Sequence, residues 1–546
     1  MAAGSAPDVY PLEQRGRAAL LTYEQLRVTA DTMDGPLQSL HGASEEEWLH
    51  AVRLFVLARH MTAAATLSEC ALEEQPASVE LRLALAGLRM EADDPDTAET
   101  HLRTVLAQTP GHIAGSFLLA RLLKSQGRMR AVSQVIAAIF EHHPREVELA
   151  IQAIELLDDC GRKQDAAELS EAAIEGGAHD PRLHVYSAML LAQVGQFDRS
   201  RRRYEFVAAS SIQAPDWHVP QGLAGLQKYQ SAEHPDFALF QRYLHEKLSD
   251  SARTSLLYAL GKAHDDIGDP ERATQYLRQA NAFDHARGDW SRKRWRHGVE
   301  ARKRRPVAGT CLEPVGHRVP VFVVGVPRSG STLLAQQLAR HPQVFHRGEL
   351  AWLPTLVAGL EADRPDYRPR LQRAAQSYLA QLYQDDSDAR WFIDKQPHNF
   401  LHIDVILSMF PQARIIHCRR SARDCALSMW MQSFQPGQQD FACDFTNMAA
   451  LIRGERQLMG HWQARYPDAI RSVRYEDLVS DPAHCMQALS QWLGLPAAAL
   501  PDRAGGGESI ATASMWQARQ PVHTRSVSRW KAYAPWLPEL LQLPDD

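Results

Sequence analysis

Two kinds of hydrophobic pattern divide the chain. Between about residue 41 and residue 286, apolar positions filled mostly by Ala and Leu recur at helical spacing, and β-branched runs are few. This pattern predicts a series of amphipathic helices. After residue 319, short β-branched runs alternate with helical stretches, and the expected strands are residues 320–325, 391–394, 413–419 and 470–475. Strands that alternate with helices predict a parallel sheet with helices on both faces.

The helical part repeats every 34 residues. Three prolines and three glycines keep this period, namely Pro76, Pro110, Pro144, Gly127, Gly161 and Gly195. A Gly fits the turn between the two helices of a unit, where a positive φ is needed, and a Pro ends the unit because it cannot continue a helix. Such a period is that of the tetratricopeptide repeat, so we expect an α solenoid of about six units. A helical bundle without repeats is the alternative.

These patterns predict four segments: an N-terminal segment of residues 1–40, a repeat array of residues 41–286, a basic linker of residues 287–318 and an α/β domain of residues 319–546. The linker is rich in Arg and Lys between Arg287 and Arg305. It is either a nucleic-acid patch or a solvated helical linker beside an anionic cofactor or the neighbouring domain. We favour the second interpretation because no nucleic-acid motif flanks the linker and the chain carries a net charge of −5.

Composition excludes several other classes of protein. The seven cysteines form no CxxC pair, which is typical of reduced thiols and not of a disulfide framework or a zinc site. The first residues lack the basic and apolar regions of a signal peptide. No window approaches the roughly 18 apolar residues of a membrane span. We therefore expect a soluble, cytoplasmic protein without a membrane or nucleic-acid partner.

The first expected strand leads into a glycine-containing loop, residues 325–332, with the sequence GVPRSGST. Helical spacing follows, so the loop aims free N–H groups and the positive end of a helix dipole at one point, which suits a phosphate. The ATP-binding loop GxxxxGK[ST] has a Lys that reaches the β- and γ-phosphates. Here Ser331 follows Gly330 and no Lys is present. The loop therefore favours a nucleotide with a short phosphate group, and an ordinary strand-to-helix turn is the alternative.

Two further motifs follow strands. Arg420 comes at the end of the strand expected at residues 413–419, and Ser428 lies about two helical turns further on. An Arg and a Ser so placed could hold a second phosphate, although a basic surface is the simpler interpretation of this motif alone. Lys395 directly follows the strand expected at residues 391–394, where it could act as an electrophile or acid.

Together these motifs, over residues 319 to about 535, resemble the sulfotransferase superfamily. The similarity is greatest to its tyrosylprotein branch and to bacterial relatives fused to tetratricopeptide repeats. The resemblance implies an α/β, P-loop-like domain with a central parallel sheet. It also implies 3′-phosphoadenosine 5′-phosphosulfate as co-substrate, adenosine 3′,5′-bisphosphate as product, and no metal.

The resemblance also assigns roles to residues. The residues matching the 5′-phosphosulfate loop are Arg328, Ser329, Gly330, Ser331 and Thr332, of which Arg328 also contacts the sulfonate. Those matching the 3′-phosphate and adenine contacts are Arg420, Ser428, Tyr475 and Arg529, where Arg529 replaces a usual Lys. Those matching catalytic positions are Arg328 of the loop, Glu349 in an RxGE stretch, Lys395 in a DKxPxN stretch, and the gate serine Ser514. Glu349 would be the base that takes the acceptor proton.

The resemblance implies transfer of a sulfonate to an acceptor hydroxyl, and we expect that acceptor to be a protein or peptide tyrosine. The repeat groove would hold the acceptor, or the array is a structural or homodimer-forming module. Arginines after Glu349, namely Arg364, Arg368 and Arg370, would read acidic residues near the tyrosine or are solvated surface. A carbohydrate or small-molecule hydroxyl, an ATP-dependent phosphotransferase, and a repeat-based interaction protein with an inactive domain are the alternatives.

Overall fold

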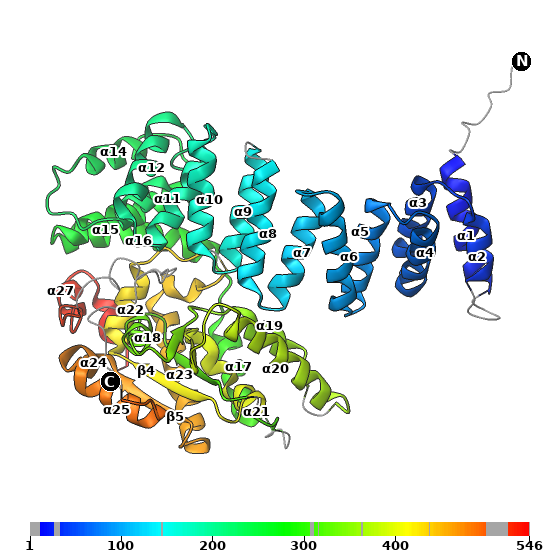
Figure 1. The fold of residues 1–546 in the computed structure, drawn as a ribbon. Helices are drawn as coiled ribbons and strands as arrows, with labels where there is room; N and C mark the ends of the chain where they lie inside the picture. The colour runs from blue at the N-terminus through cyan, green and yellow to red at the C-terminus, as the bar shows by residue number, and fades with distance from the viewer. Residues whose placement is uncertain are drawn as a thin grey trace, which may run out of the picture. The chain divides into compact units, whose positions relative to one another are not determined.

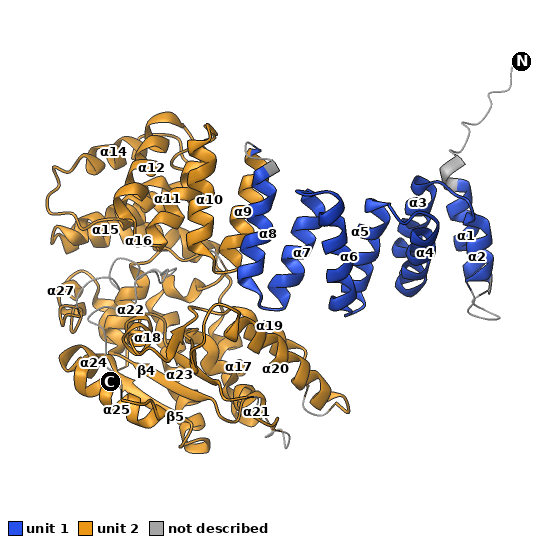
Figure 2. Cartoon of the chain, in the orientation of Figure 1, with its two compact units in different colours: residues 1–146 blue, residues 147–546 orange. Residues whose placement is uncertain are grey.

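The computed structural model describes residues 11–26, 33–142, 146–305, 311–314, 316–361, 364–435, 437–497 and 522–544. The chain forms two compact units, residues 1–146 and residues 147–546 (Figure 2). This division lies inside the predicted repeat array, because the later repeat helices pack with the C-terminal sheet domain in one unit. The predicted domain boundaries therefore stay a prediction.

The first unit consists of helices that follow one another side by side in chain order (Figure 1). They are α1 Pro11–Leu26, α2 Asp34–Leu40, α3 Glu45–Leu57, α4 Met61–Glu74, α5 Val79–Glu91, α6 Pro95–Gln108, α7 Ile113–Ser125 and α8 Met129–His142. Small residues allow the helices of a pair to approach closely: Ala64 on α4 and Ala98 on α6 are fully buried and lie 34 residues apart.

The second unit begins with further repeat helices. They are α9 Val147–Asp159, α10 Lys163–Glu175, α11 Pro181–Gln193, α12 Phe197–Ser210, α13 Val219–Gly225, α14 Pro235–Leu244, α15 Asp250–Asp266 and α16 Pro270–Arg287. The short helices α13 and α14 occupy the region where the sequence period weakens. The last pair is tightly packed, because a Cβ atom at Gly261 of α15 would lie 2.6 Å from the Leu277 side chain of α16.

A left-handed residue recurs at the turn inside each regular repeat. It is found at Arg59, Asp93, Gly127, Gly161 and Gly195, with φ between 59° and 86° and a spacing of 34 residues. The glycines confirm the predicted turn position. The two earlier turns were missed because Arg and Asp take the place of Gly there. The left-handed conformation is unfavourable for these residues, and the packing of the surrounding helix pair imposes it.

The sheet of the second unit is fully parallel, with strand order β2-β3-β1-β4-β5. The strands are β1 Val319–Gly325, β2 Val344–His346, β3 Trp391–Asp394, β4 Arg414–Arg419 and β5 Ile470–Arg474. Four strands were expected, and β2 was missed because three residues carry no periodic signal. The chain places β3 and β2 on one side of β1 and β4 and β5 on the other. The β1–β4 crevice is therefore the switch point where ligands bind in such sheets.

Helices cover both faces of the sheet. They are α18 Ser331–Ala339, α19 Trp352–Ala358, α20 Tyr367–Tyr383, α21 Ile403–Met409, α22 Ala422–Trp430, α23 Phe445–Arg465, α24 Tyr475–Ser480, α25 Pro482–Leu493 and α27 Trp530–Tyr533, with 3₁₀ turns η1 Pro397–His402, η2 Asp440–Cys443 and η3 Pro538–Gln542. Alternate residues of β1 serve two separate cores: Phe322 and Val324 pack on one face, and Val321 and Val323 on the other. The fold class predicted from the sequence is confirmed.

The stretch expected as a basic linker contains a helix, α17 Arg292–Arg304, that packs on the sheet domain. Val299 is buried, Trp295 Nε1 donates to the Ala450 carbonyl of α23 at 3.0 Å, and Arg302 Nε donates to the Leu401 carbonyl at 3.0 Å. The prediction of a solvated linker rested on the charged residues, so it missed the apolar side of this helix.

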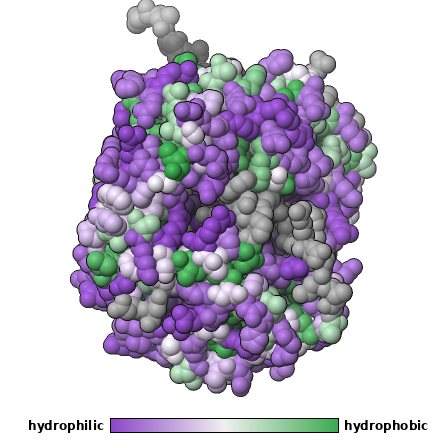
Figure 3. Space-filling model, turned by 90° about the vertical axis from the view of Figure 1, so that its left-hand side faces the viewer, coloured by the Kyte–Doolittle hydropathy of each residue, from purple (hydrophilic) through white to green (hydrophobic). Residues whose placement is uncertain are grey.

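The face of the molecule drawn in Figure 3 is mainly hydrophilic. Hydrophobic residues form small scattered groups there among polar ones. Over the described ranges, no helix combines the length and apolar character needed to cross a bilayer.

The repeat turn gives a test of its backbone conformation. A Cβ atom at Gly161 would meet nothing within 4 Å, so Gly161→Ala adds only the strain of φ 72°. We expect this variant to lose about 1–2 kcal/mol of unfolding free energy, measured by urea unfolding of the full chain. The matched control is Gly87→Ala in the middle of α5, where the added Cβ also meets nothing. It should gain about 0.5–1 kcal/mol, and equal effects of both variants would contradict the assignment.

Candidate active site

The loop between β1 and α18 requires glycine at two positions. At Gly325 a Cβ atom would lie 2.4 Å from the carbonyl oxygen of Cys418, and φ is 148°. At Gly330 a Cβ atom would lie 2.4 Å from the Tyr475 ring, and φ is 96°. The backbone therefore runs close to β4 and to α24, and α18 starts at Ser331 directly after the turn. Ser331 and Thr332 thus lie at the N-terminal end of α18, which attracts anions.

Arg328 connects this loop to the second motif across the switch point. Its Nε donates a hydrogen bond of 3.0 Å to Ser428 Oγ on α22. Arg328 also has φ 70°, a conformation that costs a non-glycine residue about 1–3 kcal/mol and that clusters at functional sites. The structure brings together these two residues, which lie 100 positions apart in the sequence.

Arg420 lies at the centre of a cluster of positive charge. Its Nη1 and Nη2 donate to the carbonyl oxygens of Arg328 at 2.9 Å and Ser526 at 2.7 Å. Burial, together with the charges of Arg420 and Arg529, lowers the pKa of Arg328 to about 10. Three guanidinium groups that repel one another beside a phosphate-type loop are a place for an anion.

Two buried polar atoms near the cluster have no hydrogen-bond partner within the described part of the chain. They are Ser329 Oγ in the loop and Arg420 Nε. Buried donors are normally satisfied, so such atoms indicate where a ligand or water would bind. Both belong to residues that the sequence assigned to the cofactor.

Tyr475 has a packing role that its predicted contact with adenine did not include. The ring is buried against Gly330, and the Arg420 guanidinium lies over it at 4.4 Å from the ring centre. A cation held over an aromatic face is stabilised by the ring's negative charge density. Tyr475 therefore orients Arg420, and its contact with adenine stays a prediction.

The C-terminal segment is fixed over this region by a carboxylate. Asp424 on α22 is buried and accepts hydrogen bonds from the backbone N–H groups of Ser528 at 2.7 Å and Trp530 at 3.0 Å. Between them, the Arg529 guanidinium is ion-paired with Asp265. Asp424 lies between Arg420 and Ser428 in the sequence, but its role in fixing this segment could not be seen from the sequence. The predicted gate serine, Ser514, lies outside the described residues.

Glu349 and Lys395, two of the predicted catalytic residues, form an ion pair. The Lys395 side chain is 1% exposed and that of Glu349 is 39% exposed. The backbone holds the pair as well, because Lys395 N donates to the Gly348 carbonyl at 2.8 Å. Lys395 follows β3, which pairs with β1, so the pair lies at the same edge of the sheet as the loop. A buried cation thus lies beside an accessible carboxylate.

Asp394, to which no role was predicted, fixes the backbone beside the Glu349–Lys395 pair. Its carboxylate is fully buried and accepts hydrogen bonds from Leu350 N at 3.2 Å, Asn399 Nδ2 at 2.7 Å and the Tyr378 hydroxyl. Burial raises the pKa of Asp394 to about 7, although these hydrogen bonds act in the opposite direction. Asp394 fixes the backbone next to Glu349, and its position directly before Lys395 was the signal that could have revealed it.

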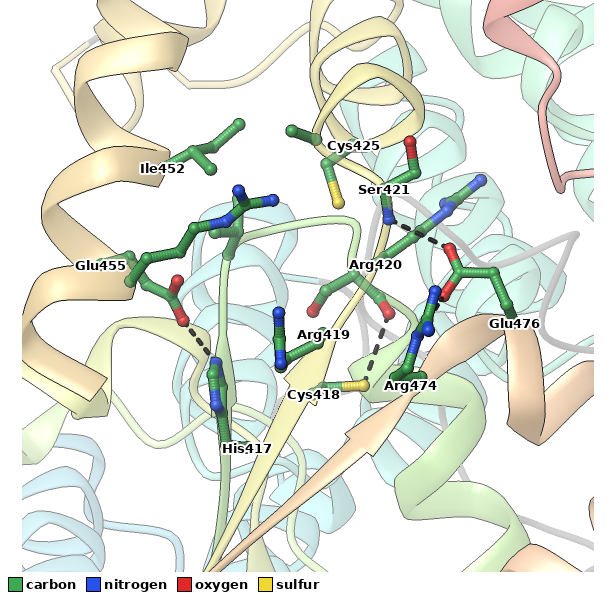
Figure 4. Close-up of a pocket in the computed structure, with 14 residues that line it drawn as sticks. His417, Cys418, Arg419, Arg420, Ser421, Cys425, Ile452, Glu455, Arg474 and Glu476 are labelled. Carbon is green, nitrogen blue, oxygen red and sulfur yellow. Dashed lines mark hydrogen bonds and ion pairs between the residues drawn. The ribbon is translucent and has the colours of Figure 1, made fainter. Parts of the chain in front are cut away.

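A cavity of about 280 Å³ opens at the carboxyl end of β4 (Figure 4). His417 and Glu455 lie on one side of it, paired at 2.6 Å, and Arg420 and Glu476 lie on the other. Glu476 accepts the N–H of Ser421 at 3.0 Å, so a carboxylate of the protein already occupies the start of α22. The cavity shares Arg420 with the cluster described above.

Comparison with known families identifies both parts of the chain. Residues 320–499 match the model described as the sulfotransferase family, and residues 89–155 match the model described as the tetratricopeptide repeat. The first match spans the loop, the Glu349–Lys395 pair and the Arg420 motif. The second lies within the helical repeats.

Individual relatives are distant. An uncharacterized protein of Aquifex aeolicus (strain VF5) is 29% identical over 316 residues, which cover 53% of this chain and 41% of that protein. Protein-tyrosine sulfotransferase 1 of Danio rerio is 25% identical over 236 residues, covering 39% of this chain and 66% of that protein. The sulfotransferase domain of the Synechococcus PCC 7002 olefin synthase is 20% identical, with a TM-score of 0.30, and covers 43% of this chain and 96% of that domain.

The chain thus spans less than two thirds of the length of both curated relatives. The residues that the two family models match include the repeat turns at Asp93 and Gly127 and the phosphate-type loop. Residues 320–499 therefore form a domain of the sulfotransferase family, in a chain whose N-terminal part carries tetratricopeptide repeats.

Proposed function

We propose that this protein transfers a sulfonate from 3′-phosphoadenosine 5′-phosphosulfate to the hydroxyl of a protein or peptide tyrosine. The observation that carries this proposal is the convergence of Arg328, Arg420 and Arg529 beside the loop. Burial, and then the charges of Arg420 and Arg529, lower the pKa of Arg328 to about 10. Such crowding favours a ligand that supplies negative charge at more than one point. A nucleotide with a 5′-phosphosulfate and a 3′-phosphate does so.

The residues present fit this co-substrate. The N–H groups at the start of α18, with Ser331 and Thr332, would hold the 5′-phosphosulfate. Arg420 and Ser428 would hold the 3′-phosphate. The unpartnered Ser329 Oγ and Arg420 Nε are the donors that such a ligand would satisfy.

The Glu349–Lys395 pair suits the chemistry of the transfer. The bound co-substrate supplies an activated sulfonate, and adenosine 3′,5′-bisphosphate leaves as the acceptor oxygen bonds to sulfur. A phenol has an ordinary pKa near 10, so a base that takes its proton is useful at neutral pH. Glu349 is accessible enough to take this proton, and the buried ammonium of Lys395 would stabilise the negative charge that develops near the sulfonate.

The relatives support tyrosine as the acceptor, because several are named as protein-tyrosine sulfotransferases. The predicted acid-reading arginines give weaker support. Arg364 and Arg370 both contact Asp366, at 3.0 and 3.9 Å, while Arg368 is exposed. Among the three, Arg368 is the better candidate for contact with an acidic peptide. A carbohydrate or small-molecule hydroxyl remains the second candidate acceptor.

Removing either member of the catalytic pair tests the assignment. We expect Lys395→Ala and Glu349→Ala each to reduce sulfonate transfer by at least about 10²–10³-fold, because a preorganised charge or the base is lost. Transfer is measured with labelled sulfonate donor. The control removes another Lys–Glu pair, Lys303 and Glu300 on α17, which is also in contact at 3.0 Å. That control should keep wild-type rates, and near-wild-type transfer by either site variant would rule out its role.

Ligand binding separates sulfonate transfer from ATP chemistry. We expect adenosine 3′,5′-bisphosphate at 100 times its Kd to stabilise the protein by about 2.7 kcal/mol, whereas ATP with Mg²⁺ should give no shift in thermal unfolding. Arg420→Ala should weaken bisphosphate binding by about 10-fold, since a charge-assisted hydrogen bond is lost. The neighbouring Arg419→Ala is the control, because Arg419 is exposed. Stabilisation by ATP alone would favour a phosphotransferase.

The acceptor is tested directly with labelled donor and a cell lysate. We expect the label in proteins and, after digestion, on peptides that contain tyrosine. Synthetic copies of those peptides should accept the sulfonate, and copies with tyrosine replaced by phenylalanine should not. Label found only in glycans or small molecules would support the second candidate acceptor instead.

A further inference from the structure

A repeat helix contributes a carboxylate to the edge of the cofactor region. Asp265 lies at the end of α15, and its two oxygens contact Nη2 of Arg529 and the hydroxyl of Tyr533. Tyr533 is buried, and its hydroxyl donates to Asp265 at 2.5 Å. These contacts join residues that lie more than 260 positions apart in the sequence.

Arg529 is fixed through both its backbone and its side chain. Asp424 holds the N–H groups on either side, those of Ser528 and Trp530. Asp265 holds the guanidinium through Nη2, and over the described ranges the structure shows no hydrogen bond from Nη1 or Nε. One nitrogen of the fork therefore anchors the group, and within the described part of the chain Nη1 and Nε are available to an anion.

The negative charge of Asp265 stabilises the charged form of Arg529 at this position. Burial alone would lower the pKa of Arg529, but the charge of Asp265 and the hydrogen bond to it raise that pKa above its ordinary value. Arg529 also lies close enough to Arg328 to lower the pKa of that residue. Without Asp265, the partly buried Arg529 would lose the largest interaction that offsets its burial, and only Tyr533 and Asp266 would remain to favour its charge.

We propose that Asp265 is a positioning residue for the sulfonate donor: it holds Arg529 where the guanidinium binds the 3′-phosphate of the nucleotide. The repeat array then completes the cofactor site. This proposal rests on the proposed function, because it takes the anion at the arginine cluster to be the 3′-phosphate.

Other contacts hold the same surfaces together without Asp265. Arg278 of α16 bonds to Glu539 at 2.8 Å and to the Trp536 carbonyl at 2.9 Å, and Asn281 donates to the Trp430 carbonyl at 2.9 Å. Removing the charge of Asp265 therefore leaves α16 docked on the C-terminal segment. If Asp265 had a purely structural role, its replacement would weaken the binding of every ligand to the same extent.

The test compares two ligands that differ only in the 3′-phosphate. Binding of adenosine 3′,5′-bisphosphate and of 5′-AMP to the full chain is measured by calorimetry. We expect Asp265→Asn to weaken bisphosphate binding by at least 10-fold and to leave 5′-AMP binding unchanged. Arg529→Ala should do the same, and the double variant should be no worse than Arg529→Ala alone, because Asp265 acts through Arg529.

Two controls separate positioning from structure. Asp265→Glu keeps the charge and should recover part of the bisphosphate affinity. Glu539→Gln removes another carboxylate–arginine pair between the repeats and the C-terminal segment and should change neither ligand's affinity.

Asp265→Asn with wild-type bisphosphate affinity, or with equal losses for both ligands, would overturn the proposal while the proposed function stands. A wild-type chain that does not prefer the bisphosphate to 5′-AMP would overturn both. If Asp265→Asn fails to fold, the bisphosphate affinities of Arg529→Ala and Arg529→Lys are compared instead. Equal affinity in these two variants also overturns the proposal.

Discussion

The mutual repulsion of three partly buried guanidinium groups is the constraint on which the sheet domain of this protein depends. Arg328, Arg420 and Arg529 converge where the strand order reverses, and their charges oppose one another. Several features of the fold answer that constraint. The left-handed backbone of Arg328 directs its side chain to Ser428, the Tyr475 ring supports Arg420, and Asp265 anchors Arg529. The arrangement is costly without a counter-charge, and the proposed anion would make it favourable.

Two buried carboxylates, those of Asp424 and Asp394, fix the backbone at two places in this site. Asp424 accepts backbone N–H groups on both sides of Arg529, and Asp394 accepts the N–H next to Glu349. Each thus sets the position of a neighbouring functional side chain without contacting that side chain through its own oxygens. Placed at the two sides of β1, they leave the loop between them free to meet the ligand.

The sequence predicted those features that local chemistry dictates. The strand-to-helix loop, the strand ends at Lys395 and Arg420, and the glycine turns of the repeats follow from residue type and spacing. It could not predict interactions that depend on folding over long separations, such as Asp265 with Arg529 or Trp295 against α23. It also missed the turns at Arg59 and Asp93, since backbone strain imposed by neighbouring helices leaves no trace in residue type.

The packing of α17 sets a lower limit on the length of a fragment that keeps the sheet domain intact. Trp295 fits so closely on α23 that a Cβ atom at Gly454 would lie 2.4 Å from its indole nitrogen. A gene fragment beginning at residue 319 would expose this surface and would lose Asp265 as well. A fragment that keeps these contacts therefore has to include α15 to α17, so the folding unit is larger than the residues 320–499 that match the family model.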